Sequence, residues 1–229
     1  IAKSMVVAAK AASQPMDRFT NFSLTQTVHA LASWWRPALN QGQLIFHDPS
    51  SLIYVLGAYG GKDVAGQVRS LILSDAITEK GRRQLLALLA RVGNANDVQT
   101  VFSHAIRDPQ LLELLPAIAQ GRRLTPSGSV HDNLEILFTH ERVAVRAAAV
   151  RLAGLWNQRQ LIPLLEPMLK GDDDLVLAAT VRSLGELSPD SAVEELRPFI
   201  SITQPQSVVL AALEAIGQQD INVTAIAGL

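Results

Sequence analysis

The side chains best suited to bind a metal ion or transfer a proton are the five histidines: His29, His47, His104, His131 and His140. No two of them are four residues apart, so no helical turn would place a pair on one face as zinc ligands. His131 and His140 flank a predicted helix, where helix capping and solvent exposure explain them. The chain has no cysteine, which excludes disulfides, thiolate zinc sites, a thiol nucleophile and thioether-linked haem within it, and leaves its redox compartment open. We therefore predict no metal site.

Acidic residues cluster in three places that resemble known kinds of site. In Asp172–Asp174 the acids are consecutive and a glycine precedes them, whereas an EF-hand loop needs alternating acids, a central glycine and a glutamate at position twelve. Glu194 and Glu195 would point about 100° apart on a helix, and Glu186 with Asp190 forms the other candidate carboxylate pair. Phosphate-loop, dinucleotide-binding and nucleophile-elbow motifs are absent. We predict that this segment is not an enzyme and has no catalytic, cofactor-binding or metal-binding residues.

The arginines could form a phosphate-binding stripe along a concave surface. Arg142 and Arg146 are four residues apart and share one helical face. Proteins that bind duplex nucleic acid usually carry a marked positive excess, yet this chain has 20 basic and 21 acidic residues and a net charge of −1. A nucleic-acid-binding solenoid is therefore the alternative hypothesis, and nucleic acid is not the favoured partner. The arginines considered for the stripe are Arg82, Arg83, Arg122, Arg123, Arg142, Arg146, Arg151 and Arg159.

Three tryptophans are the largest aromatic residues. Trp35 continues an apolar row that begins at Leu24, so we expect it in the core, and Trp156 is expected to fill a turn between helices. Trp34 points about 100° away from Trp35, either at the edge of that core or on a surface that faces a partner. Exposed tryptophans often anchor protein interfaces. The candidate interaction surface consists of Trp34, Arg122, Arg123, Arg142 and Arg146.

A repeated unit must position these residues, because glycines recur after apolar stretches at intervals of 28 to 33 residues: Gly60, Gly93, Gly121, Gly154, Gly185 and Gly217. Apolar residues return every three or four positions, which predicts helices; the row Leu24, Val28, Leu31 and Trp35 is one example. A polar turn and a second apolar stretch follow each glycine. Only Leu44–Phe46 and Ser129–Val130 could be extended, and neither alternates for long enough to predict a strand.

Pairs of helices of about 30 residues that bury their apolar faces against neighbouring pairs form an α-solenoid. We predict an all-α, right-handed α-solenoid of about six to seven HEAT-like helix pairs, in a single domain over residues 1–229. Val143–Ala149 resembles the second-helix signature of HEAT repeats, a valine and an arginine followed by small residues. Leu177 and His140 stand where an arginine and an aspartate are usual, so the Asp–Arg ladder that often joins HEAT units is predicted to be mostly missing.

Helix ends are marked by several local signals. Ser191–Glu194 fits a capping box, and Gly185 and Gly217 are predicted to end their helices. Pro167 and Pro198 should bend or shorten the helices that contain them. Further N-caps are predicted at Asp63, Thr78 and Asp97.

Three motifs in the N-terminal third stand in a fixed order, Met16–Phe19, Trp35–Leu39 and Gly42–Phe46, and a helical stretch beginning at Ser51 follows them. This series resembles the HEAT-repeat region of large exported bacterial proteins that are similar to membrane-bound dehydrogenases. The resemblance covers residues 16–120 in motif detail, whereas residues 121–229 resemble generic HEAT units.

In that family a sugar-dehydrogenase-like β-propeller, a HEAT segment and a C-terminal c-type cytochrome with a CxxCH haem motif are joined in one chain. The resemblance implies that this chain is a non-catalytic interaction module or spacer between those two protein domains, with haem c in the parent chain and no cofactor of its own. It also implies a periplasmic or exported location; without it, a cytoplasmic one is expected. The chain contains neither a propeller nor a CxxCH motif, so no catalytic or haem residue of the family can be assigned to it.

Apolar runs in the chain are short. None exceeds six residues, the length of Val208–Leu213, against about 20 needed to span a bilayer, and Met5–Ala9 is shorter than the core of a signal peptide. We expect no membrane span and no signal peptide. The chain does not begin with methionine and ends soon after a further helix has begun, so we expect both ends to continue into a longer protein.

Overall fold

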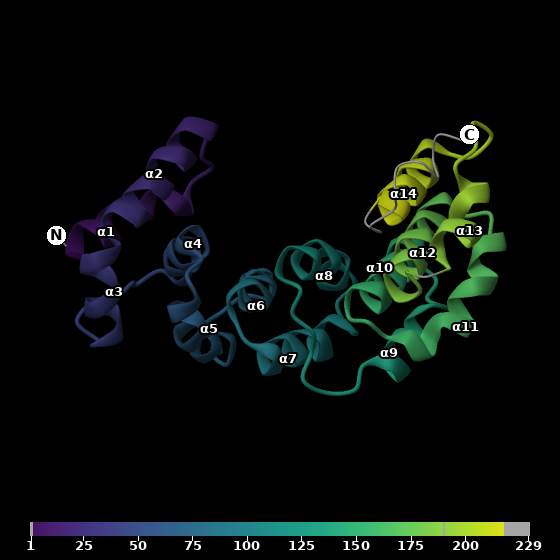
Figure 1. Cartoon of the computed structure of the whole chain (residues 1–229). Coiled ribbons are helices and arrows are strands. Elements are labelled where there is room, and N and C mark those ends of the chain that lie inside the picture. The colour runs from purple at the N-terminus through teal and green to yellow at the C-terminus, as the bar shows by residue number, and fades with distance from the viewer. Residues whose placement is uncertain (1, 190, 218–229) are drawn as a thin grey trace. The chain divides into compact units, whose positions relative to one another are not determined.

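The computed structural model describes residues 2–189 and 191–217, and every regular element in this part of the chain is helical (Figure 1). The predicted all-α solenoid is confirmed, and neither Leu44–Phe46 nor Ser129–Val130 forms a strand. The chain divides into two compact units, Ile1–Asn94 and Ala95–Leu229. Each unit is described by itself, and the predicted single domain over residues 1–229 stays a prediction.

The helices of the first unit are α1 (Ala2–Ala9), α2 (Arg18–Ala30), α3 (Ala32–Asn40), α4 (Pro49–Tyr59), α5 (Ala65–Ile72) and α6 (Glu79–Val92), with the 3-10 turns η1 (Lys10–Ser13) and η2 (Lys62–Val64). The even-numbered helices form one row, because α4 packs against both α2 and α6. α1 contacts α2, α3 and α4 at the start of the unit, and α5 packs against α6.

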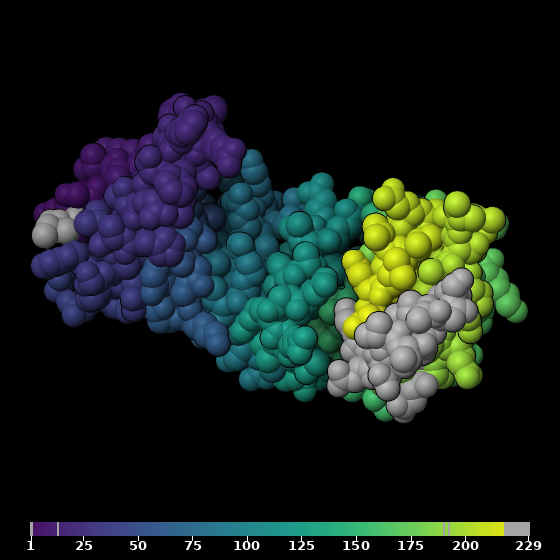
Figure 2. Space-filling model, turned by 45° about the horizontal axis from the view of Figure 1, so that its top comes forward, coloured from purple at the N-terminus to yellow at the C-terminus, as the bar shows by residue number. Residues whose placement is uncertain are grey.

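The helices of the second unit are α7 (Ala95–Ala105), α8 (Pro109–Arg122), α9 (His131–Leu137), α10 (Val143–Leu155), α11 (Ile162–Leu165), α12 (Asp174–Leu187), α13 (Ala192–Leu196) and α14 (Gln206–Gly217), with the 3-10 turns η3 (Arg159–Leu161), η4 (Glu166–Lys170) and η5 (Arg197–Phe199). α8, α10, α12 and α14 pack in sequence as one row. Figure 1 shows α11 and α13 on one side of α10, α12 and α14. In the space-filling view, side chains fill much of the space between neighbouring ribbons on the face that is shown (Figure 2).

The motif around Trp35 joins the elements of the first unit. Trp35 is fully buried and donates from its indole nitrogen to the carbonyl oxygen of Val28 at 2.9 Å. Its ring meets that of Tyr59 edge-on, with the centroids 5.4 Å apart. Arg36 lies over the Tyr59 ring, 4.9 Å from its centroid, and pairs with Asp63 at 2.6 Å. These contacts bind α3 to the end of α4 and to η2, so the motif is structural, and Asp63 is an ion-pair partner instead of the predicted N-cap.

Close approach between neighbouring helices distinguishes the row in the second unit. A Cβ atom on Gly154 would lie 2.7 Å from Cα of Ser183, and one on Gly185 would lie 2.5 Å from Cβ of Ala215. The Ser183 hydroxyl also donates to the carbonyl oxygen of Val150 at 2.8 Å. The prediction that Gly185 ends its helix was wrong, because α12 continues to Leu187 and this glycine lets α14 pack closely.

Ion pairs run along the same row. Arg146 of α10 pairs with Asp173, the N-cap of α12, at 3.3 Å. This pair is one rung of the Asp–Arg ladder, which was predicted from the sequence to be mostly missing. A second ladder, which the sequence did not predict, joins the helices themselves. Arg151 donates to both carboxylate oxygens of Glu186 at 2.5 and 2.7 Å. Arg182 of α12 continues this ladder to Glu214 of α14 at 2.7 Å.

The predicted helix ends had mixed outcomes. The Thr78 side chain caps α6 by accepting from the amide of Gly81, as expected. Ser191 makes no side-chain cap at α13, so the predicted capping box was wrong, and Asp97 lies buried within α7. Prolines shorten α11 and α13 as expected. Pro167 and Pro198 lie in the 3-10 turns η4 and η5, where α-helical hydrogen bonding has stopped.

Candidate functional site

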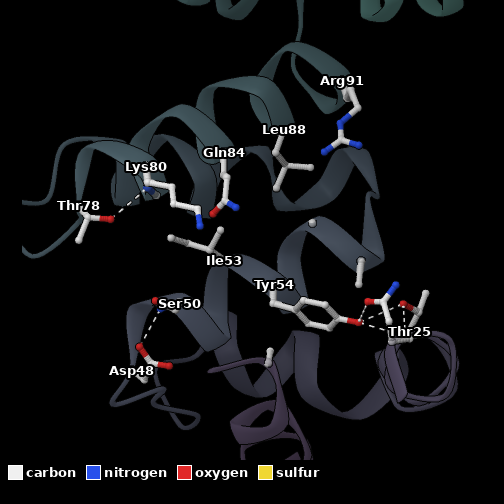
Figure 3. A pocket seen from close by; sticks show the side chains of 15 residues that line it. Thr25, Asp48, Ser50, Ile53, Tyr54, Thr78, Lys80, Gln84, Leu88 and Arg91 are labelled. Carbon is white, nitrogen blue, oxygen red and sulfur yellow. Dashed lines mark hydrogen bonds between the residues drawn. The ribbon is translucent and has the colours of Figure 1, made fainter. Parts of the chain in front are cut away.

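A groove of about 810 Å³ runs along the even-numbered helices of the first unit. Its lining comes from α2, α4 and α6 and from the residues that precede α4 and α6, with Ala12 of η1 as the remaining contributor. This volume falls within the range of about 300–1,000 Å³ that is typical of ligand-binding clefts. Figure 3 shows α6 forming one wall and α4 the opposite wall.

The α6 wall is a row of four side chains, Lys80, Gln84, Leu88 and Arg91. Intervals of four, four and three residues place them on one face of the helix. Lys80, Gln84 and Arg91 are exposed, whereas Leu88 is buried. In the close view Lys80 and Gln84 extend from α6 toward Ile53 of α4 (Figure 3).

In the described chain, Lys80 and Arg91 have no anionic partner, in contrast to six arginines. Across residues 2–189 and 191–217, no carboxylate lies within ion-pair distance of either side chain. Arginines with a carboxylate partner include Arg36, Arg82, Arg142, Arg146, Arg151 and Arg182. The groove therefore presents two cations whose charge the described protein does not neutralise.

The opposite wall is held in place by Tyr54 of α4. Its hydroxyl donates to the side-chain oxygen of Asn21 at 2.8 Å and to the backbone oxygen of the same residue at 3.2 Å. The hydroxyl of Thr25 lies 3.2 Å away from it (Figure 3). These bonds fix α4 against α2 and leave a polar, hydroxyl-rich edge along the groove.

The floor of the groove is formed by apolar and small side chains. Ile53 of α4 and Leu88, at the base of the α6 wall, are buried there. Gly57, in the last turns of α4, also lines the groove, and a Cβ atom added there would meet no heavy atom within 4 Å. Open space at Gly57 means that the groove could admit a side chain of a ligand at this point.

Among the residues that the structure describes, Asp48 is the one carboxylate that lines the groove. It caps α4 by accepting from the amides of Ser50 and Ser51 at 3.0 and 3.2 Å and from the Ser51 hydroxyl at 2.9 Å. These hydrogen bonds, first that of the Ser50 amide, hold the pKa of the Asp48 carboxyl below its usual value. Its negative charge is therefore directed at the helix N-terminus.

The structure does not gather the predicted interaction residues into one site. Trp34 is 55% exposed on α3, in the first unit. Arg122 lies at the end of α8 and Arg123 is exposed just after it, in a left-handed conformation with φ of 50°. Arg142 pairs with Glu113 at 2.7 Å, and Arg146 pairs with Asp173. Two of the four predicted arginines are therefore already partnered by carboxylates of the second unit.

The histidines and acidic residues considered in the sequence analysis do not come together as a site among the described residues. Among the residues that the structure describes, no group of three or more histidine, aspartate or glutamate side chains converges as a metal site would. His131 lies 2.8 Å from its neighbour Asp132 and 2.7 Å from the hydroxyl of Ser129. Asp173 serves as a helix cap and Glu186 as an ion-pair partner, and Asp190 lies outside the described residues.

The groove residues were not predicted to form a site. Lys80, Gln84 and Arg91 share a helical face, and that spacing was visible in the sequence. The same pattern is typical of any solvated helix face, so it carries no signal without the opposite wall. The missing information was the position of Tyr54 and Gly57, which lie 23 or more residues earlier in the chain.

Comparison with known proteins places the repeats in the second unit. A family model for HEAT repeats matches residues 131–218, which span α9 to α14. This part of the chain is therefore a HEAT-repeat segment, and HEAT repeats generally act as scaffolds for protein interactions. No curated protein matches the chain.

Helices α1 to α14 are short compared with a bilayer. None of them, within the part of the chain that the structure describes, is long and apolar enough to cross a membrane.

Proposed function

We propose that the chain is a non-catalytic scaffold for protein interactions, and that the groove of its first unit receives a segment of a partner protein. The observation that carries this proposal is the groove itself, about 810 Å³ in volume and lined along three successive helices. An elongated groove of this kind suits a polypeptide segment, because successive side chains of the segment can contact successive helices.

The composition of the groove supports binding in preference to catalysis. Its ionisable side chains are Lys80, Arg91, Asp48 and Tyr54, and Asp48 and Tyr54 are engaged in hydrogen bonds that fix α4. The lining contains no histidine, and no nucleophile paired with a base accompanies these groups. We accordingly propose that the segment has no enzymatic activity and no cofactor of its own.

The second unit supports the mechanical part of the same proposal. Close glycine contacts and three ion pairs join α10, α12 and α14, and such packing suits a rigid spacer. The resemblance of residues 16–120 extends the proposal to a particular setting. In that setting the chain separates a dehydrogenase-like propeller from a c-type cytochrome domain of the same parent protein.

Selection from a displayed library of random peptides tests the groove. Peptides selected on the 229-residue chain should lose binding when Gly57→Trp fills the groove, because the added indole would occupy open space there. Gly66→Trp is the matched control, since Gly66 of α5 also faces open space and does not line the groove. Circular dichroism would confirm that both variants are folded.

Each outcome of the selection bears on the proposal. Loss of binding in Gly57→Trp with retention in Gly66→Trp supports the groove as the interaction site. Peptides that bind both variants equally well would show that the groove is not the site.

Reading the coding sequence on either side of these residues tests the proposed setting. A CxxCH motif after Leu229 and a propeller before Ile1 are expected. Unrelated neighbouring domains would remove the spacer role and leave the groove proposal intact.

A further inference from the structure

The two free cations of the groove stand at the ends of the α6 wall. Lys80 lies in the first turn of α6 and Arg91 in the last, eleven residues apart. With a rise of 1.5 Å per residue, their Cα atoms are separated by about 16 Å along the helix. An extended polypeptide rises about 3.3 Å per residue and points alternate side chains to the same side, so two side chains that face α6 across this distance lie about four or six residues apart in the segment.

The charges of the groove favour an acidic ligand. Lys80 and Arg91 have no carboxylate partner within the described residues, whereas both oxygens of Asp48, the opposing charge, accept hydrogen bonds at the start of α4. A carboxylate brought to either cation would gain an ion pair without breaking one. Complementary charge at the two ends would also set the register of the bound segment.

The middle of the groove suits the part of a segment between two acids. Gln84 faces it from α6 (Figure 3), and its amide can both donate to and accept from a peptide backbone. Ile53 and Leu88 form an apolar floor, and the open space at Gly57 leaves room for one apolar side chain.

From this arrangement we propose that the groove of the first unit binds an extended protein segment that carries two acidic side chains about four or six residues apart, on the same side of the segment. An apolar residue lies between the two acids. The acids pair with Lys80 and Arg91, and the apolar residue occupies the space above Gly57. This inference rests on the proposed function and specifies the ligand of the same groove.

Fluorescence anisotropy with synthetic nine-residue peptides tests the inference on the full 229-residue chain. The first peptide carries glutamates at positions 2 and 6, on the same side of an extended chain, with a leucine between them. A second peptide has the glutamates adjacent, and a third has lysines in their place. We expect the first to bind at least about tenfold more tightly than the others, and its affinity to fall as salt is raised, because ionic strength screens exposed ion pairs.

Neutralising Lys80 and Arg91 in the protein tests whether these two cations bind the acidic peptide. Lys80→Gln with Arg91→Gln should weaken binding of the first peptide about tenfold or more and flatten its salt dependence. The matched control is Lys170→Gln with Arg107→Gln, two exposed residues of the second unit, which makes the same change in net charge and should leave binding unaltered. Gly57→Trp should abolish binding.

The contrary outcomes are distinct. Equal binding of all three peptides, or no binding of the first up to millimolar concentration, would overturn the inference. Displacement of that peptide by a single-stranded oligonucleotide at lower concentration would assign the groove to nucleic acid instead. If library-selected peptides depend on Gly57 but carry no acids, the proposed function stands and the acidic ligand is wrong.

Discussion

The two units use the same row of even-numbered helices in opposite ways. In the second unit, Gly154 and Gly185 lie where an added Cβ would come within 2.7 Å of the next helix. In the first unit, Gly57 occupies a comparable helix in the row, yet a Cβ there would meet nothing within 4 Å. The same residue type therefore permits close packing in one unit and leaves room in the other.

Charged side chains follow the same division. Arginines along α10 and α12 pair with carboxylates of the following helix. Lys80 and Arg91 of α6 extend over a groove without such partners in the described residues. Ion pairs between neighbouring helices hold the row of the second unit together. Unpaired cations beside the groove of the first unit are available to bind a ligand. The match to HEAT repeats falls on the tightly packed unit, at residues 131–218.

Enlarging Gly185 should disrupt the second unit most. Gly185→Val places its Cβ 2.5 Å from Cβ of Ala215, so we expect a loss of about 2–4 kcal/mol in the free energy of unfolding from overpacking. Urea denaturation followed by circular dichroism measures this loss. Gly121→Val in α8, where the added Cβ meets open space, should change the free energy by less than about 0.5 kcal/mol. Equal effects would contradict close packing at Gly185.

Removing Glu186 should rank second. Glu186→Ala leaves Arg151, whose side chain is only 11% exposed, without its bidentate partner, and we expect a cost of about 1–2 kcal/mol. Glu113→Ala breaks the more exposed pair with Arg142 and should cost less than about 1 kcal/mol. The same denaturation assay ranks the two variants, and the reverse order would show that the ladder does not stabilise the second unit.

The cap at Asp48 predicts a pH-dependent difference in the first unit. Asp48→Ala should cost about 1 kcal/mol, because the amides at the start of α4 lose their acceptor. The folded-state pKa of Asp48 is lowered from 3.8, so the contribution of its ionised form is fully present above that value and is lost as the pH falls below it. Denaturation at pH 6 and pH 3 should show the wild-type chain losing more stability than Asp48→Asn. An identical pH dependence of the two proteins would rule out this contribution.

Gly57→Ala should have the smallest effect and the opposite sign to Gly185→Val. Alanine is a better helix former than glycine and meets no atom at this position, so we expect a gain of about 0.5–1 kcal/mol. Thermal denaturation would detect it as a raised midpoint. A loss of stability would mean that the groove at Gly57 is closed in solution.

The repeating fold was predictable because its signal is local and recurrent. Apolar spacing of three and four residues identified the helices, and the recurring glycines mark the even-numbered ones, from Gly60 after α4 to Gly217 at the end of α14. Burial of Trp35 was predicted from the same periodicity, and burial of Trp156 from its place in the turn just after Gly154; both are confirmed. The role of Gly185 was mistaken, because glycine serves equally at a helix end and at a close helix contact.

The contacts between helices were not predictable from local patterns. Arg151 and Glu186 are 35 residues apart, and many arrangements of two helices would separate them. The groove depends in the same way on how α4 and α6 are spaced. Lys80 and Arg91 therefore resembled ordinary exposed residues, whereas Arg142 and Arg146, which were predicted to face a partner, bind carboxylates of their own unit.

The tryptophans give each unit its own optical reporter. Trp35 is fully buried in the first unit, with its indole nitrogen bonded to Val28. Trp156 is buried in the second, edge-on to Phe102, and its indole nitrogen has no hydrogen-bond partner among the described residues. With the exposed Trp34 replaced by phenylalanine, emission from either remaining indole would shift to longer wavelength only when its own unit opens. Fluorescence can therefore distinguish whether the two halves of the chain melt together or one after the other.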